Sequence, residues 1–121
     1  MAEHIELGKK GEEIAAEYLK NQGYRIRETN WRFARYEVDL IAETKGVLVV
    51  AEVKTRSSNT ITEPEASVTR EKQRHLIAAA NAYLRIKNLK MEVRFDILAI
   101  VMTLEEHRLT HIPDAFYAMI R

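Results

Sequence analysis

An interrupted apolar run over residues 37–56 restricts most strongly the folds that this chain can adopt. Lys45 and Gly46 separate its two halves, and a two-residue turn that ends in glycine is typical of a tight β-hairpin. If these residues form the turn, Thr44 lies opposite Val47, and the register of both strands follows. A three-residue turn would instead shift the register by one residue.

The two-residue turn sets the charged residues of the hairpin against one another at the end away from the turn. Asp39 then lies opposite Glu52, and Glu37 lies opposite Lys54. Directly opposed residues project from the same face of a sheet, so the four groups form one cluster. The other face is apolar and must be covered by protein. Its residues are Val38, Leu40, Ala42, Val47, Val49, Ala51 and Val53.

Two explanations fit this charged cluster. Cross-strand ion pairs at an exposed sheet end would need no further function, and each would contribute a few tenths to about 1 kcal/mol. However, three acids against one lysine leave a surplus of negative charge. Neighbouring carboxylates repel unless a proton or a cation lies between them, and carboxylate oxygens suit Mg²⁺. The cluster therefore also fits a magnesium site.

A magnesium site of this composition predicts phosphodiester hydrolysis. A metal held by Asp39 and Glu52 would polarise the phosphate and lower the pKa of a bound water. Lys54, two residues beyond Glu52 on the same face, would position that water or offset charge in the transition state. The three residues would thus have distinct roles.

The overall composition adds few limits on function. With 121 residues, the chain suits one domain over its whole length, residues 1–121. It contains no cysteine, which excludes disulfides and thiolate zinc sites and favours the cytoplasm. We expect no membrane partner, because no apolar run is long enough to span a bilayer and the N-terminal residues lack the features of a signal peptide. A net charge of +1 does not by itself indicate a nucleic-acid partner.

Hydrophobic periodicity predicts the remaining elements. Helices are expected over residues 5–22 and 69–86, where apolar residues recur at helical spacing. Besides the hairpin, strands are expected over residues 24–29, 93–102 and 108–112. The order α-β-β-β-α-β-β predicts an α/β fold with a mixed sheet flanked by helices, in which the second helix is a crossover.

Basic and aromatic residues are interleaved between Lys20 and Tyr36. This pattern suits phosphate contacts combined with base stacking. The alternative is a solvated surface with anchoring aromatic residues. The candidate nucleic-acid-binding residues of this segment are Arg25, Arg27, Arg32 and Arg35.

Several motifs occur in an order that resembles a known family. They are Gly8-x-x-Gly11-Glu12-x-x-Ala15, Gly23-Tyr24, Glu37-Val38-Asp39-Leu40-Ile41-Ala42, Glu52-Val53-Lys54-Thr55-Arg56, Arg94-Phe95-Asp96-Ile97 and His111-Ile112-Pro113-Asp114-Ala115-Phe116. Asp39 with Glu52 and Lys54 resembles the PD-(D/E)xK nuclease signature. Together the motifs resemble the YraN-like family of predicted bacterial endonucleases, which are similar to archaeal Holliday-junction resolvases. The resemblance spans essentially the whole chain. It implies a restriction-endonuclease-like fold and DNA cleavage with Mg²⁺, for which Mn²⁺ is an expected substitute.

The resemblance also implies further site residues. Glu12 matches a glutamate of the first helix that completes the acidic cluster in resolvase relatives; the alternative is an acid favoured by the helix dipole. Gln73 resembles a polar residue of the second helix near the site, although a solvated helix face is the simpler interpretation. Glu37 is a candidate for holding Lys54 in place. Phosphate contacts are expected from Arg56, Lys72 and Arg74.

Two positions lie outside this pattern. Tyr36 stands where the family usually has a glycine, and it would alter the approach of substrate or offer a stacking surface. Asp96 lies among apolar residues, where an unpaired charge is costly. It is either a fourth acidic site residue or a partner of Arg94 or a neighbouring strand.

The leading hypothesis is a metal-dependent DNA endonuclease that acts on branched or flapped DNA. One alternative is a non-catalytic nucleic-acid-binding or repair-partner module with the nuclease fold, and another is a purely structural interaction domain. Resolvases of this fold act as dimers because a four-way junction offers two symmetric cut sites, so a homodimer is expected. The loop 57–67 and an amphipathic tail over 113–121 are candidate interface segments.

Overall fold

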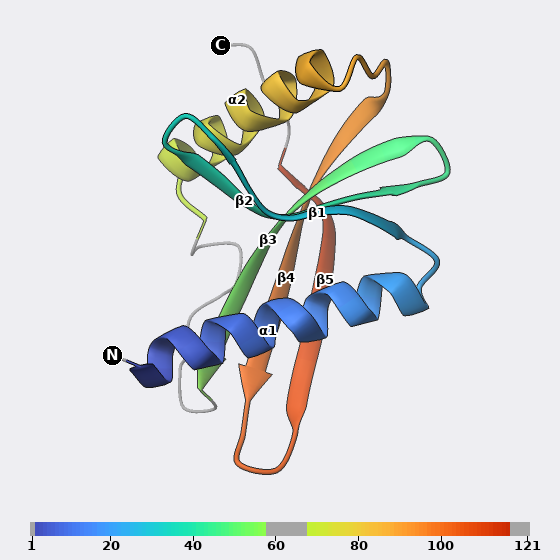
Figure 1. Ribbon diagram of the computed structural model, residues 1–121. Coiled ribbons are helices and arrows are strands. Elements are labelled where there is room, and N and C mark those ends of the chain that lie inside the picture. The colour runs from blue at the N-terminus through green and yellow to red at the C-terminus, as the bar shows by residue number, and fades with distance from the viewer. Residues whose placement is uncertain (1, 58–67, 117–121) are drawn as a thin grey trace.

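A five-stranded mixed sheet forms the centre of the computed structural model, which describes residues 2–57 and 68–116 (Figure 1). The elements are α1 (Ala2–Asn21), β1 (Arg25–Phe33), β2 (Tyr36–Thr44), β3 (Val47–Ser57), α2 (Arg70–Ile86), β4 (Glu92–Met102) and β5 (His107–Phe116). In the sheet the strands follow the chain order, β1-β2-β3-β4-β5. The predicted α/β class and the order α-β-β-β-α-β-β are confirmed.

The parallel pairing of β3 with β4 explains the position of α2 in the chain. These two strands pair along their whole length, from Val47↔Glu92 to Ser57↔Met102, whereas the other neighbouring strands are antiparallel. Parallel strands need a crossover connection, and α2 lies in the segment between them. The predicted crossover is therefore confirmed, and β3 is the central strand.

The predicted hairpin register is confirmed near the turn. The pairs run from Thr44↔Val47 to Leu40↔Ala51. Lys45 and Gly46 have φ angles of 48° and 81°, and two positive φ angles are the signature of a type I′ turn. Leu40↔Ala51 is the last pair of this ladder in the described part of the chain, so the strands separate next to Asp39 and Glu52.

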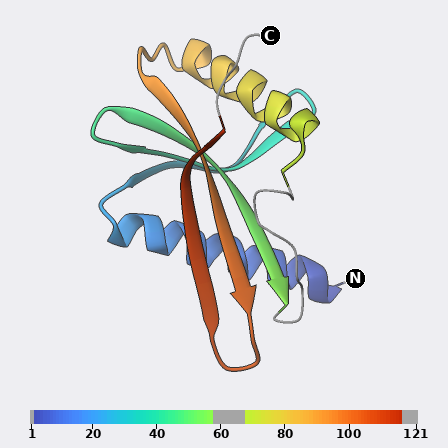
Figure 2. The same cartoon turned by 180° about the vertical axis from the view of Figure 1, so that it is seen from behind.

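The two helices cover opposite faces of the sheet. Ala15 and Leu19 of α1 pack with one face, whose residues include Leu40, Ala42, Val49 and Ala51. The buried face of α2 packs with the other face, whose residues include Ile41, Leu48 and Val50. Figure 1 shows α1 in front of the long strands, and in Figure 2, seen from behind, it lies on the far side.

One residue of the hairpin packs on a different side from the predicted one. Val38 belongs to the cluster under α2, not to the face of Leu40 and Ala42. On β1, Trp31 pairs with Val38 and Thr29 with Leu40, while the residue between them, Asn30, has a φ of 50°. The pairing of β1 with β2 keeps its register across this point, but the left-handed backbone of Asn30 and the end of the β2–β3 ladder lie here, and the strict alternation assumed from the sequence does not extend past Asp39.

The strands are longer than the sequence predicts at two places. β1 continues to Phe33 because it pairs with β2 as far as Phe33↔Tyr36. β5 continues to Phe116, so its last residues extend the strand and do not start a tail. It is an edge strand, where Pro113 is tolerated. Residues 58–67 and 117–121, in the candidate interface segments, lie outside the described residues. None of the helices in the described part is long and apolar enough to cross a membrane.

Close packing of α1 on β3 requires a glycine at position 11. A Cβ atom there would lie 1.9 Å from Oγ1 of Thr55, whereas a Cβ at Gly8 would meet nothing within 4 Å. We expect Gly11→Ala to lower the free energy of unfolding by about 1–3 kcal/mol despite its gain in helix propensity. Gly8→Ala has the same propensity gain and is expected to be neutral or stabilising. Urea unfolding of both proteins tests this, and equal effects would contradict it.

Candidate active site

Asp39 marks the point where β2 leaves β3. Its Oδ2 accepts a hydrogen bond from the backbone N–H of Val53 at 2.8 Å. This bond replaces the ladder pair that would otherwise follow Leu40↔Ala51. A side chain held by the backbone of the neighbouring strand has a fixed orientation, so the Asp39 carboxylate is preorganised beside Glu52.

Glu52 is a buried carboxylate with few partners. The residue is 4% exposed, and its Oε1 has no hydrogen-bond partner among the described residues. Its Oε2 lies 3.7 Å from Nζ of Lys54 and 3.7 Å from Nζ of Lys72. Burial first, and then the negative charge of Asp39, raise the pKa of Glu52 to about 8. The two lysines act in the opposite direction and do not offset this effect.

The fit of a divalent cation can be judged from these contacts. A buried oxygen without a partner is costly unless a proton or a cation reaches it. Asp39 and Glu52 supply the hard oxygen atoms that Mg²⁺ prefers. Within residues 2–57 and 68–116, no three side chains of the metal-binding types are already gathered as a ligand set. The two carboxylates therefore fit an ion such as Mg²⁺, which keeps several water ligands and takes others from a phosphate.

Glu12 lies within electrostatic reach of this pair. It follows Gly11 on α1 and lines a cavity of about 290 Å³ between α1 and β1. Partial burial, and next the charge of Asp39, raise the pKa of Glu12; a hydrogen bond from Asn30 lowers it, and Glu37 adds a smaller increase. The structure thus brings Glu12 toward the acidic pair, with Asn30 as a neighbour that the sequence did not single out.

Glu37 does not hold Lys54. Its carboxylate forms an ion pair with Nε of Arg32 at 3.2 Å, whereas Lys54 pairs with Glu52. The expected Glu37–Lys54 contact required the hairpin ladder to continue past Leu40, and the ladder does not do so. Glu37 instead adds negative charge near Glu12.

The first turn of α2 carries Lys72 to the site. Thr69 is the N-cap of the helix, and its side chain accepts a hydrogen bond from the backbone N–H of Lys72 at 3.1 Å. Nε2 of Gln73 donates to the carbonyl of Val68 at 3.1 Å. Gln73 therefore supports the start of the helix, and the described contacts give it no bond to the acidic pair. Lys72, predicted only as a phosphate contact, is the residue of α2 that reaches Glu52.

The predicted basic and aromatic surface is largely engaged in the fold. Trp31 packs edge-on against Tyr83 of α2, with ring centroids 5.1 Å apart. Tyr36, in the place of the family glycine, stacks on His75 at 4.7 Å. Arg74 is exposed on α2, and Arg56 is partly buried on β3. Arg25 and Arg27 pair with Glu43, Arg32 pairs with Glu37, and Arg35 lies over the ring of Tyr36.

Asp96 is a structural residue. Arg94 donates two hydrogen bonds to its carboxylate, at 2.9 and 2.8 Å, and Nε2 of His111 lies 2.7 Å away. The backbone N–H of Asp114 donates a further bond at 3.1 Å. Burial alone would raise the pKa of Asp96, but these partners together lower it. Of the two interpretations, the pairing with Arg94 is correct.

The sequence is similar to a large group of bacterial proteins. The model of the uncharacterised protein family UPF0102 matches residues 11–100, which include all four predicted catalytic positions. The chain is 44% identical over 117 residues to UPF0102 protein FP2501 of Flavobacterium psychrophilum, covering 97% of this chain and 98% of that one. It is 46% identical over 120 residues to a UPF0102 protein of Phocaeicola vulgatus, covering 99% of both chains.

Proposed function

The chain belongs to the UPF0102 family, as its YraN-like motifs implied, and we propose that it is a metal-dependent endonuclease that hydrolyses phosphodiester bonds in DNA. One observation carries the proposal: Glu52 is a buried carboxylate with an unpartnered oxygen, next to a second carboxylate and two lysines. An ion-pair network that served stability alone would not leave one oxygen of a buried carboxylate without a hydrogen-bond partner.

The side chains of this cluster divide the proposed reaction among them. Mg²⁺, or Mn²⁺ in its place, would be held by Asp39 and Glu52 and would supply a Lewis acid and a water of lowered pKa. Asp39, oriented by the N–H of Val53, limits the positions of the scissile phosphate. Water attacks phosphorus and gives up a proton to solvent, the bond between phosphorus and the leaving oxygen breaks, and that oxygen takes up a proton from solvent. The ammonium groups of Lys54 and Lys72 stabilise the negative charge that develops on the phosphate.

A panel of labelled substrates tests the proposal. Duplex, single-stranded, flap and four-way DNA are incubated with Mg²⁺ or Mn²⁺ and with wild-type, Asp39→Ala and Lys54→Ala proteins. We expect cutting of at least one substrate by the wild type and a loss of about 100-fold or more in both variants. Glu17→Ala, which changes an exposed acid of α1, is the matched control. Cutting that persists undiminished in both site variants would refute the assignment.

One observation favours a non-catalytic module as the second candidate function. The arginines Arg25, Arg27 and Arg32 of β1 offer phosphate contacts that need no metal ion. In that case DNA binding would depend on Arg25, Arg27, Arg32 and Arg35 and would be independent of divalent ions. The substrate panel separates the two candidates, because only the endonuclease produces fragments.

A homodimer belongs to the same proposal. Two copies related by a twofold axis would present two equivalent sites to a symmetric DNA substrate such as a four-way junction. This extends the resemblance to resolvases.

A further inference from the structure

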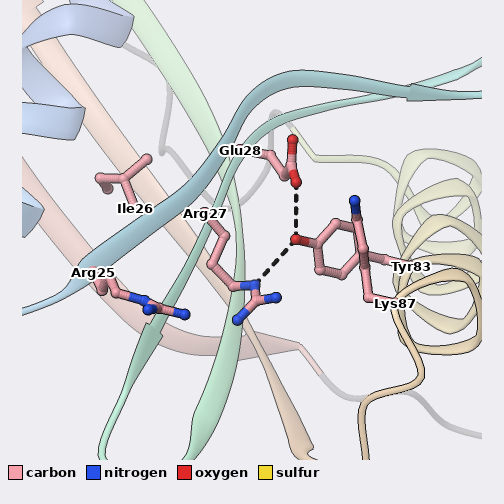
Figure 3. Close-up of a pocket in the computed structure, with 6 residues that line it drawn as sticks. All are labelled: Arg25, Ile26, Arg27, Glu28, Tyr83 and Lys87. Carbon is pink, nitrogen blue, oxygen red and sulfur yellow. Dashed lines mark hydrogen bonds between the residues drawn. The ribbon is translucent and has the colours of Figure 1, made fainter.

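A polar pocket of about 290 Å³ lies between β1 and the C-terminal end of α2, away from the acidic pair (Figure 3). It is lined by Arg25, Ile26, Arg27, Glu28, Tyr83 and Lys87. Figure 3 shows that its cationic side chains come from both sides, with the two arginines on β1 and Lys87 at the C-cap of α2. This pocket has no role in the proposed reaction, and most of its lining is charged.

Arg27 is held rigidly in this pocket. Its Nε donates to the hydroxyl of Tyr83 at 3.0 Å, and that hydroxyl donates to Oε2 of Glu28 at 3.0 Å. Its Nη1 donates to Glu43 at 2.7 Å. A guanidinium has five N–H donors, so these two bonds fix its plane and leave donors for a ligand. Tyr83 is only 1% exposed, which makes it a firm support for the arginine.

The pocket also has a surplus of positive charge. Arg25 and Arg27 share a single oxygen of Glu43, and Glu28 is the only other acid in contact with the group within the described chain. Lys87 lies over the Tyr83 ring, with Nζ 5.9 Å from the centroid, and has no acidic partner among the residues described. Three cations therefore face two carboxylates, and the excess cation has no acidic partner.

The position of the pocket on α2 relates it to the acidic pair. Lys72 and Lys87 lie 15 positions apart, which is about 22 Å along a helix at 1.5 Å per residue. Tyr83 is eleven positions after Lys72, or about three turns, so Lys72 and Tyr83 project from the same side of the helix. A DNA strand advances about 3.4 Å per nucleotide in a duplex. Measured along the axis of a duplex, the distance therefore corresponds to about six base pairs.

We propose that Arg25, Arg27 and Lys87 form a second contact for duplex DNA, which binds a backbone phosphate about six base pairs along the duplex from the bond that is cut. A planar arginine of fixed orientation with two flanking cations suits a phosphodiester, which carries one negative charge and several acceptor oxygens. The inference rests on the proposed function for the location of the cut, but the binding it requires does not depend on cutting.

Fluorescence anisotropy in EDTA tests this contact without any cleavage. Lys87→Glu is compared with Lys90→Glu, which reverses an exposed lysine outside the pocket. For a 20-base-pair duplex we expect Lys87→Glu to weaken binding about ten-fold and to lower the salt slope by about one, with Lys90→Glu much closer to wild type. A DNA hairpin with a stem of four base pairs, which is stable because its strands are joined and is too short to reach both contacts, should lose no more with Lys87→Glu than with Lys90→Glu. Lys87→Met, which removes the charge without reversing it, should give a smaller loss in the same direction.

Each result supports or overturns the second contact. Equal losses for Lys87→Glu and Lys90→Glu would overturn it, as would an equal loss on short and long duplexes. If inorganic phosphate bound to the wild type and not to Lys87→Glu while the affinity for DNA stayed unchanged, the pocket would serve a free anion and the inference would be wrong. If the wild type bound DNA as expected but never cut it, the proposed function would fail and the second contact would stand.

Discussion

Glu52→Gln is expected to abolish metal-dependent cutting and, in the same protein, to raise the free energy of unfolding at pH 8. Burial and the charge of Asp39 raise the pKa of Glu52 to about 8. Between its ordinary value of 4.5 and about 8, the folded protein therefore keeps a proton that the unfolded chain has released. The metal-free wild type must lose stability as the pH rises through this window. Glutamine removes that loss because it cannot ionise.

The expected size of this effect is about 1–3 kcal/mol at pH 8 and much less at pH 5. Urea unfolding in EDTA at several pH values measures it, and parallel pH profiles for wild type and variant would contradict it. Glu43→Gln is the matched control, for which the expected change in the free energy of unfolding has the opposite sign. Hydrogen bonds from Arg27 and Arg25 outweigh the effect of burial and lower the pKa of Glu43, so its replacement should destabilise the protein. Cutting by Glu52→Gln should fall about 100-fold or more because a metal ligand is lost.

Arg94→Met is expected to lower the free energy of unfolding by about 3–5 kcal/mol. Asp96 has a fully buried side chain, and Arg94 supplies two of its hydrogen bonds. Without the arginine, a buried carboxylate would keep only His111 and the N–H of Asp114. Arg94 also donates to the hydroxyl of Tyr24 at 2.8 Å, so the start of β1 would lose a contact as well.

Chemical denaturation measures this loss, with Arg108→Met on the exposed part of β5 as the control. The double variant Arg94→Met/Asp96→Asn should recover part of the stability because it removes the unpaired charge. A loss below about 1 kcal/mol for Arg94→Met would show that the pair is not required for the fold.

The sequence predicted the hairpin well because its register depends on a local signal. Lys45 and Gly46 form the turn, and every pair back to Leu40↔Ala51 follows from it. It predicted the place of the acidic pair less completely, because the separation of β2 from β3 depends on the partners on either side. β2 also pairs with β1, and β3 also pairs with β4. The sequence of the hairpin alone does not show that these outer pairings limit its own ladder.

Residues brought together by distant elements were the ones that sequence reasoning missed. Lys72 was predicted only as a phosphate contact, and it reaches Glu52 because the capped start of α2 lies beside β3. Asn30 meets Glu12 through an irregular strand. Tyr83 was not among the candidates because it sits at an apolar helical position, yet its hydroxyl organises Arg27 and Glu28. A signal for Tyr83 did exist, since a buried phenol needs a hydrogen-bond partner.

The motifs behind the resemblance separate into two groups in the structure. Those around Glu12, Asp39 and Glu52 lie around the acidic pair. Those around Arg94 and His111 form the buried network that holds Asp96. The motifs around the acidic pair therefore account for the proposed chemistry. The motifs around Asp96 hold the end of α1 and the edge strand β5 to the sheet, where the hydroxyl of Tyr18 lies 3.1 Å from Nδ1 of His111.

In the proposed reaction, Asp39 and Glu52 make DNA cleavage depend on a divalent ion. To test this dependence, the rate of cutting of one labelled substrate is measured as Mg²⁺ is raised from zero, with wild-type and Asp39→Ala proteins that have matching unfolding curves. We expect saturable, EDTA-sensitive cutting by the wild type and a decrease in rate of about 100-fold or more in the variant. Equal rates for the two proteins, or wild-type cutting that continues in EDTA, would contradict it.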